Sequence, residues 1–290
     1  MKKSINSQQT LSPFDGRAFE ERGYVVLRGL LEPAVVAGVR DEMARLVDGL
    51  AAGLVEAGTI PHGFHDEPLE TRMIRLYERN LDQAPKHFRE NLHLKGLFPL
   101  FFHARLLDVV AQILGPEIRL YPNYTARPKL PEWSGTEVLW HQDGGYTAKL
   151  NGGAEEAVTN MRMVNVWTPL VPARVVNGCM QFVPGSHRLG VVAHEQREHY
   201  LEIAPLALKP HLPNAISIEV DPGDVVLFHN LLFHCGLPNH AKTIRWSLDW
   251  RYQDATQPTQ RPQRGHMARS ARSPTTVVRS AEEWARLTFI

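Results

Sequence analysis

Hydrophobic positions in the N-terminal part of the chain recur with the period of an amphipathic helix. Over residues 32–53 an apolar side chain stands at every third or fourth position, which predicts a helix with one buried face and with charged residues such as Glu42 on the opposite face. The same spacing predicts helices near residues 70–82 and 103–114. The second of these ends at Gly115-Pro116, a common helix stop signal.

After residue 116 the pattern changes to short alternating runs that are separated by turn residues. Residues 161–170 and 245–252 alternate in this way, and residues 216–220 and 225–229 predict a hairpin-like pair. Many short strands at even spacing are typical of a β-sandwich or a jelly roll. We therefore predict a mainly β fold with flanking helices.

The change of pattern divides the chain into layers rather than into separate domains, because amphipathic helices need a surface to cover. We expect a single domain over residues 1–290, with a mainly helical layer (1–116), a β core (117–255) and a C-terminal tail that covers the site (256–290). Residues 1–16 are polar, which predicts a loosely held leader.

Composition excludes several classes of function. The 290 residues carry a formal net charge of +1, so no electrostatic argument supports a nucleic-acid or membrane partner. The apolar runs are too short for a transmembrane helix, and no apolar stretch of a secretory signal follows the first lysines. We expect a cytoplasmic protein that acts on a small molecule and has no obligate protein partner. Its two cysteines, Cys179 and Cys235, are expected to be buried thiols.

Candidate chemistry begins at His141-Gln142-Asp143, which follows a predicted strand. Residues i and i+2 of a strand point to the same face, so the imidazole of His141 and the carboxylate of Asp143 are expected to converge. His229 and His234 both offer a third ligand, and the spacing of His229 favours a structural role. Two histidines and one carboxylate are typical of non-haem Fe(II) oxygenases. By itself, however, a His-x-Asp in a chain with 14 histidines also fits a polar strand end.

A candidate anchor for a co-substrate follows on the next predicted strand. Arg245 and Ser247 share one face of that strand. An arginine binds a carboxylate through two parallel hydrogen bonds. An inward arginine between Trp246 and Leu248 is costly to bury without a partner, so Arg245 is expected to bind an anion.

These motifs, in this order and spacing, resemble the phytanoyl-CoA dioxygenase family of Fe(II)- and 2-oxoglutarate-dependent oxygenases. The resemblance spans roughly residues 17–255. The residues that carry it are His141-Gln142-Asp143, Trp167-Thr168-Pro169-Leu170, Asn177-Gly178-Cys179-Met180, Pro184-Gly185-Ser186-His187-Arg188, Gly223-Asp224, Phe228-His229, His234 and Arg245.

The resemblance implies a double-stranded β-helix, the cupin-like jelly roll, with helices packed outside. It implies that His141, Asp143 and His234 bind Fe(II) and are catalytic through the metal, and that Arg245 binds the distal carboxylate of 2-oxoglutarate. The other residues that it implies for the co-substrate are Trp167, Lys129, Ser247 and Thr125.

Two positions separate this chain from its relatives. Where relatives often carry a serine two residues after the distal histidine, this chain has Gly236, and Ser247 is expected to supply the hydroxyl instead. Related halogenases have a small residue at the position of Asp143, which leaves space for chloride, so the aspartate argues against halogenation.

The implied reaction is hydroxylation of an aliphatic C–H of a small metabolite or natural-product intermediate, with 2-oxoglutarate and O2 as co-substrates and release of succinate and CO2. Desaturation, epimerisation or cyclisation by the same oxidant, or a metal-binding cupin that is not an oxygenase, are the alternatives.

Variable segments are expected to form the lid, namely residues 54–100, 144–160, 190–215 and 255–290. The candidate substrate contacts are Asn123, Gln142, Arg72, Arg75 and Arg269, and the arginines among them, with Arg79 and Arg272, indicate an anionic or polar substrate.

Overall fold

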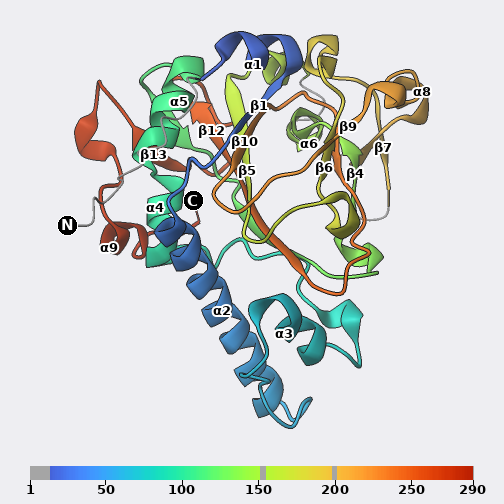
Figure 1. Ribbon diagram of the computed structural model, residues 1–290. Helices are drawn as coiled ribbons and strands as arrows, with labels where there is room; N and C mark the ends of the chain where they lie inside the picture. The colour runs from blue at the N-terminus through green and yellow to red at the C-terminus, as the bar shows by residue number, and fades with distance from the viewer. Residues whose placement is uncertain (1–13, 151–154, 198–200, 290) are drawn as a thin grey trace, which may run out of the picture.

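Two antiparallel sheets form the body of the protein, and helices cover the larger one (Figure 1). The computed structural model describes residues 14–150, 155–197 and 201–289. The arrangement is the mainly β fold with flanking helices that the sequence predicts.

The larger sheet has seven strands within the described ranges, in the order β1-β10-β5-β12-β2-β13, and β3 pairs with β12 beside this path. Its strands are β1 (Tyr24–Leu27), β2 (Ile118–Leu120), β3 (Thr125–Lys129), β5 (Met163–Pro169), β10 (Val225–His229), β12 (Arg245–Asp254) and β13 (His266–Arg269). Because β1 and β13 belong to this sheet, it draws on the chain on both sides of the predicted core, residues 117–255.

The smaller sheet has the order β4-β11-β6-β9, and β7 pairs with β8 in a separate two-stranded sheet. The strands are β4 (Val138–His141), β6 (Met180–Phe182), β7 (His194–Gln196), β8 (Leu201–Ile203), β9 (Ile216–Ile218) and β11 (His234–Gly236). The predicted hairpin over residues 216–229 is therefore wrong, because β9 pairs with β6 whereas β10 pairs with β1 and β5. The turn between β9 and β10 carries the chain from one sheet to the other.

Helices α4, α5 and α9 lie on the left of Figure 1, and α2 extends from the body with α3 beside it. The described helices are α1 (Gly16–Arg22), α2 (Pro33–Glu56), α3 (Leu69–Leu76), α4 (Phe98–Phe101), α5 (Ala104–Leu114), α6 (Asp143–Leu150), α7 (Glu155–Thr159), α8 (Pro205–Leu208) and α9 (Ala281–Trp284). Short 3-10 turns span Leu81–Gln83, Lys95–Leu97, Ser134–Thr136, Val175–Asn177, Ser186–Leu189, Leu212–Asn214 and Pro274–Thr276.

The predicted helices at 32–53 and 103–114 are confirmed as α2 and α5. On α2 the apolar stripe is buried as expected, but Glu42 is buried too, so its assignment to the solvent face was wrong. Its carboxylate accepts a hydrogen bond from the backbone N–H of Gly96 at 2.8 Å, because the Lys95–Leu97 turn packs against this side of the helix.

Other local predictions need correction. The helix predicted at 70–82 ends at Leu76, since Tyr77 leaves the helical conformation. The segment 190–215, which was assigned to the lid, contains β7, β8 and α8 within its described residues. The expected leader falls largely outside the described residues, although Gly16 already begins α1, where the side chain of Asp15 accepts a hydrogen bond from the N–H of Ala18.

Alternation along the central strands explains why a site lies between the two sheets. On β10, Val225 and Leu227 pack into the core beneath the helices, whereas Val226 and Phe228 face the space between the sheets. The same alternation on β5 sends Val166 to the helices. A strand that is buried on both faces reads as a continuous apolar run, as β10 does.

Both cysteines are buried free thiols, as expected. No single described helix is long and apolar enough to cross a membrane. The segments Lys95–Phe101 and Ala104–Leu114 meet that criterion only as a pair bent by 42°.

Candidate active site

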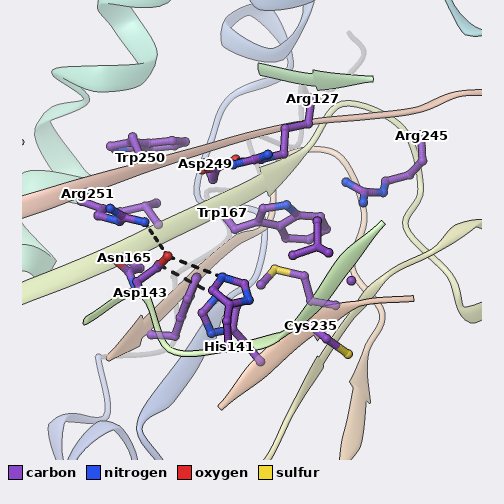
Figure 2. Close-up of a pocket in the computed structure, with 16 residues that line it drawn as sticks. Arg127, His141, Asp143, Asn165, Trp167, Cys235, Arg245, Asp249, Trp250 and Arg251 are labelled. Atoms are coloured by element: carbon purple, nitrogen blue, oxygen red, sulfur yellow. Dashed lines mark hydrogen bonds and ion pairs between the residues drawn. The ribbon is translucent and has the colours of Figure 1, made fainter. Parts of the chain in front are cut away.

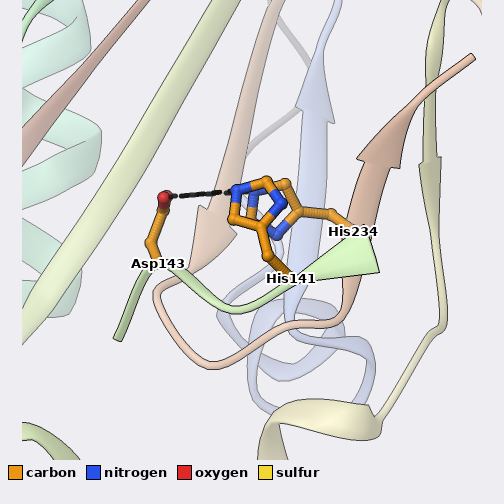
Figure 3. A group of neighbouring side chains, drawn as sticks. All are labelled: His141, Asp143 and His234. Carbon is orange, nitrogen blue, oxygen red and sulfur yellow. Dashed lines mark ion pairs between the residues drawn. The ribbon is translucent and has the colours of Figure 1, made fainter. Parts of the chain in front are cut away.

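Three buried side chains converge between the sheets, from β4, β11 and the start of α6 (Figure 3). His141 and His234 are register partners on neighbouring strands. Nε2 of His141 lies 3.6 Å from Oδ1 of Asp143, and Nε2 of His234 lies 3.9 Å from Oδ2. One donor atom from each residue lies within 4.8 Å of the other two, a spacing that can hold one metal ion.

The structure brings this predicted trio together by a different route from the one the sequence suggested. His141 is the last residue of β4, but Asp143 is the first residue of α6 rather than part of the strand. Strand alternation therefore does not explain why the two side chains meet. The chain turns between them, and the N–H of Gly144 donates to the carbonyl of Asn230 at 2.9 Å, which ties the start of α6 to the loop before β11.

Both imidazoles are oriented for metal binding by the backbone. Nδ1 of His141 lies 2.8 Å from the carbonyl of Leu139, and Nδ1 of His234 lies 2.8 Å from the carbonyl of Leu232. A carbonyl can only accept, so each Nδ1 carries the proton and each Nε2 keeps its lone pair for a metal. Burial is the main cause that lowers the pKa of His234 to about 3, so its imidazole is neutral at physiological pH.

Arg251 on β12 contacts the carboxylate of this trio. Its Nη2 donates to Oδ1 of Asp143 at 2.5 Å (Figure 2). Burial alone raises the pKa of Asp143, but Arg251 and the two histidines outweigh it and hold the pKa well below its usual range. Asp143 is therefore an anion, as a metal ligand must be.

A small inner cavity of about 70 Å³ adjoins the trio and contains Arg245 and Trp167 (Figure 2). Arg245 is buried, and its Nη1 donates to Oγ of Ser247. Its Nε has no partner among the described residues, and its guanidinium carbon lies 5.4 Å from the ring centroid of Trp167. Burial lowers the pKa of Arg245 to about 10, which still leaves it charged. A buried cation with an unused donor fits an anionic ligand.

Asn165 on β5 is a site residue that the sequence reasoning missed. It lines the inner cavity and is 1% exposed, yet neither polar atom of its side chain has a partner in the described chain. A buried amide without a partner indicates a ligand that completes it. Asn165 stands two residues before Trp167, so alternation along the predicted strand was the signal that could have found it.

Asp249 and Arg251 were missed in the same way. Arg245 and Ser247 were predicted to share a face of their strand, and two further steps along β12 lead to Asp249 and Arg251. Both line the inner cavity.

A larger outer cavity of about 700 Å³ opens from the same place, since His141, Asp143 and Arg245 line both cavities. Lys129 lines it, and its Nζ donates to the carbonyl of Leu237 at 2.6 Å. Burial, with a contribution from the charge of Arg245, lowers the pKa of Lys129 to about 7.

The remaining polar candidates on this side differ in whether they reach the cavities. Asn123 lines the outer cavity, although it precedes β3 rather than lying on a strand. Thr125 and Ser247 are fully buried beside the cavities without lining them, and Ser247 acts on Arg245. Gln142 is not free to meet a substrate, because its amide is bonded to the backbone of Gly190, Leu231 and Val192.

The arginines predicted to contact substrate lie elsewhere, so that part of the prediction was wrong. Arg72 is buried against Asp48 at 2.6 Å, Arg75 pairs with Glu78, and Arg269 pairs with Asp108. These three guanidinium groups are thus already paired with carboxylates of the protein. None of the three arginines lines either cavity. Arg79 and Arg272 are exposed and line neither cavity.

The predicted lid segments do contribute other residues to the outer cavity. Within the described chain they are Lys86, His87 and Arg89 from 54–100, Tyr146 from 144–160 and Arg261 from 255–290. Residues 190–215, as far as the structure describes them, supply none. His229 does not belong to the trio either, as expected, since its Nδ1 accepts a hydrogen bond from the N–H of Leu231.

The fold and the converging donors define a non-haem iron enzyme of the jelly-roll class. The family model described as phytanoyl-CoA dioxygenase (PhyH) matches residues 19–247, and the chain therefore belongs to this family. The predicted class, an Fe(II)- and 2-oxoglutarate-dependent dioxygenase, is confirmed.

Relatives of known activity resemble most of the chain. The 1-deoxypentalenic acid 11-beta-hydroxylase of Streptomyces arenae is 27% identical over 254 residues, which cover 83% of this chain and 80% of that protein. The ectoine dioxygenase of Sphingopyxis alaskensis is 27% identical over 240 residues, which cover 77% of this chain and 70% of that protein.

Solved structures agree with the fold. The crystal structure of EctD from S. alaskensis with 2-oxoglutarate and 5-hydroxyectoine has a TM-score of 0.55 at 21% identity, covering 88% of this chain and 80% of that one. The epimerase SnoN from nogalamycin biosynthesis, in complex with Fe3+ and alpha ketoglutarate, has a TM-score of 0.56 at 20% identity, covering 84% of each chain.

Proposed function

We propose that this dioxygenase hydroxylates an aliphatic C–H of a small organic molecule, with His141, Asp143 and His234 as the iron ligands. Two imidazoles and one carboxylate on one side of a cavity suit Fe(II) and leave further metal positions open. Iron bound there supplies the activation of O2. The role of the protein is to hold the donor atoms, orient the co-substrate and keep bulk water out.

Arg245 would bind the distal carboxylate of 2-oxoglutarate. Its unused Nε and its buried charge support this role, because a carboxylate satisfies both at once. Ser247 orients the guanidinium through Nη1, and Trp167 forms the wall beside it. Asn165 would donate to, and accept from, polar groups of the same ligand or of water that it retains. Lys129 would approach the co-substrate from the outer cavity.

The net reaction balances as R–H plus O2 plus 2-oxoglutarate giving R–OH plus succinate plus CO2. One oxygen atom enters the new hydroxyl group and the other enters succinate. In a reaction run under 18O2, hydroxylation places one labelled oxygen atom in the product. Desaturation and epimerisation leave the product without the label.

The outer cavity supports a small-molecule substrate, since it is enclosed by apolar and charged side chains and has a volume of about 700 Å³. The relatives named above act, by their names, on 1-deoxypentalenic acid and ectoine, which are small organic molecules. A cytoplasmic location is part of the proposal and is supported by the two free thiols.

The single observation that carries this function is the convergence of the three donors beside the unsatisfied, buried Arg245. The test is to add Fe(II) and 2-oxoglutarate to the protein without oxygen and to record the weak visible charge-transfer band of the bound co-substrate. We expect a band in the wild type and a loss of about tenfold or more in 2-oxoglutarate affinity in Arg245→Gln, because a charged hydrogen-bond pair is removed.

Arg75→Gln is the matched control, since Arg75 forms an exposed ion pair away from both cavities. It should bind 2-oxoglutarate as the wild type does. A wild type without the band, or an Arg245→Gln variant with undiminished affinity, would contradict the proposed function.

A further inference from the structure

Two arginines of the outer cavity, Arg89 and Arg261, form no ion pair with any carboxylate in the described ranges. Most other cations of this cavity are already engaged. They are Arg251 (with Asp143), Arg127 (with Asp249) and Lys129 (with the carbonyls of Gly236 and Leu237), while Arg245 is the proposed anchor of the co-substrate. Arg89 and Arg261 are therefore available for a ligand.

Arg89 is half-buried and poorly satisfied. Its Nη2 makes a long contact of 3.4 Å with Oγ1 of Thr125, and its Nε has no partner among the described residues. Its position is set by the preceding residue, Phe88, which forms a β-bridge with Ala126 of β3. A guanidinium that is withdrawn from water without an acceptor is unfavourable, so an oxyanion in the cavity would complete it.

Arg261 is held in place through one end only. Its Nε donates to the hydroxyl of Tyr121 at 3.0 Å, and its guanidinium carbon lies 5.5 Å from the centroid of the same ring. Tyr121 is fully buried, and its hydroxyl donates to the carbonyl of Thr259 at 2.7 Å. The terminal nitrogens of Arg261 have no partner in the described chain, so the planar fork is oriented in advance and left open.

The surroundings carry excess positive charge and an apolar wall. Burial lowers the pKa of Arg89 to about 10, and the charges of Arg127, Arg251 and Arg261 add to this effect while Asp249 opposes it. Lys86 adds a further cation at the cavity. The same cavity is also lined by Pro128, Val138, Leu139 and Tyr146.

Building on the function proposed above, we propose that Arg89 and Arg261 together bind the terminal oxyanion of the substrate, a carboxylate or a phosphate, while its apolar body lies along Val138 and Leu139. The cavity that contains the two arginines is also lined by His141 and Asp143. One molecule can therefore be held by its charged end at the arginines and present a C–H of its apolar body to the metal centre. Arg89 and Arg261 select the substrate by its charge and fix which carbon reaches the metal.

The test uses three probes that share one apolar body, namely 1-adamantanecarboxylate, 1-adamantylphosphonate and the neutral 1-adamantanecarboxamide. Each is titrated calorimetrically, without oxygen, into protein loaded with Fe(II) and 2-oxoglutarate. We expect at least one anionic probe to bind about tenfold or more tightly than the amide, because charged hydrogen bonds to two guanidinium groups are lost in the amide. Which anion binds more tightly distinguishes a carboxylate substrate from a phosphate substrate.

The preference for an anion should fall to about twofold or less in Arg89→Gln and in Arg261→Gln. It should persist in part in Arg89→Lys and fully in Arg75→Gln, whose side chain is outside both cavities. Equal binding of acid and amide by the wild type, no binding of either anion, or an unchanged preference in both glutamine variants would overturn the proposal.

The affinity for 2-oxoglutarate, measured in the same samples, separates this inference from the function on which it rests. Neither Arg89 nor Arg261 lines the inner cavity. Glutamine variants that bind 2-oxoglutarate normally and lose the anion preference support the inference. A wild type that fails to bind 2-oxoglutarate would instead overturn the proposed function.

Discussion

Nη2 of Arg251 lies 2.5 Å from Oδ1 of Asp143, so a residue of β12 in the larger sheet holds the carboxylate with which α6 begins. This contact fixes the rotation of the carboxylate that, in the proposed function, shares a metal with His141 and His234. Hydrogen bonds to the ligands of a metal usually matter almost as much as the ligands themselves.

We therefore predict that Arg251→Gln weakens Fe(II) binding by about 10–100-fold, the usual effect of removing a partner of a ligand. Anaerobic Fe(II) titration measures it. Arg162→Gln is the control, because Arg162 also pairs with a buried carboxylate, that of Asp254 at 2.7 Å, but lies outside both cavities. Equal Fe(II) affinity in Arg251→Gln and the wild type would show that the carboxylate needs no support.

Gly236 offers a test of the hydroxyl that relatives often carry at this position. A side chain added there would meet Cβ of Val138 at 3.4 Å and Nζ of Lys129 at 3.5 Å, which are ordinary contacts, so serine fits. We predict that Gly236→Ser tightens 2-oxoglutarate binding by about two- to tenfold, the range for one added neutral hydrogen bond. Titration of 2-oxoglutarate into the Fe(II) protein measures the effect. Gly236→Ala should leave the affinity unchanged, and a serine variant no better than the alanine variant would refute the prediction.

The lowered pKa of Lys129 predicts how 2-oxoglutarate binding depends on pH. Its pKa is lowered to about 7, mainly by burial and next by the charge of Arg245, with a smaller contribution from Arg127, while Glu137 opposes the shift. The protonated amine of Lys129 attracts the dianionic 2-oxoglutarate. The affinity for 2-oxoglutarate is therefore highest below this pKa and falls as the pH rises through it. We predict that the dissociation constant of 2-oxoglutarate increases between about pH 7 and pH 9 in the wild type.

Lys129→Arg should remove this pH dependence, because the guanidinium stays charged over the whole range. Lys129→Met should remove it as well, at a uniformly weaker affinity. The measurement is 2-oxoglutarate binding at several pH values. A wild type and a methionine variant with parallel profiles would exclude a role for the amine.

Gly178 packs closely against Leu237 and against Lys129, which lines the outer cavity. It has a φ of 83°, and an added Cβ would lie 2.4 Å from the carbonyl oxygen of Leu237 and 2.6 Å from Cδ of Lys129. We predict that Gly178→Ala lowers the free energy of unfolding by about 2–4 kcal/mol, from the left-handed backbone and the overpacking together.

Gly58→Ala separates the two contributions, because Gly58 has a φ of 67° with nothing near its added Cβ. It should cost about 1–2 kcal/mol, the backbone contribution alone. Denaturant unfolding of both variants measures the difference. Equal losses would mean that the backbone turn, and not the contact with Leu237 and Lys129, requires glycine at 178.

How much of the site was predictable depends on how regular the chain is around each residue. His141 and Asp143 were predicted by residue type and spacing, whereas His234 was given as a ligand by the family resemblance. Arg245 was predicted from its inward position on a strand. Alternation along that strand extends to Arg251. Arg89 and Arg261 lie in irregular segments, where position depends on contacts such as the bridge between Phe88 and Ala126.

Strand pairing was also only partly predictable from the sequence. Short apolar runs identified β9 and β10 as strands, but such runs do not name the strand with which they pair. Neighbouring strands usually form a hairpin, and here a turn at Asp221–Asp224 sends them into different sheets, where β9 pairs with β6 and β10 with β5. Pairing depends on how the sheets close over the site, which is a property of the whole chain.

The carbonyl groups that orient the two imidazoles belong to Leu139 and Leu232, each two residues before its histidine. Main-chain acceptors therefore orient both rings, and Leu139 also lines the outer cavity. Residue 139 can change in size or polarity without disturbing the hydrogen bond of His141. Substrate preference in this fold can thus diversify next to the metal while the oxidising centre stays the same, and position 139 is a natural first choice for redirecting the enzyme to a new C–H bond.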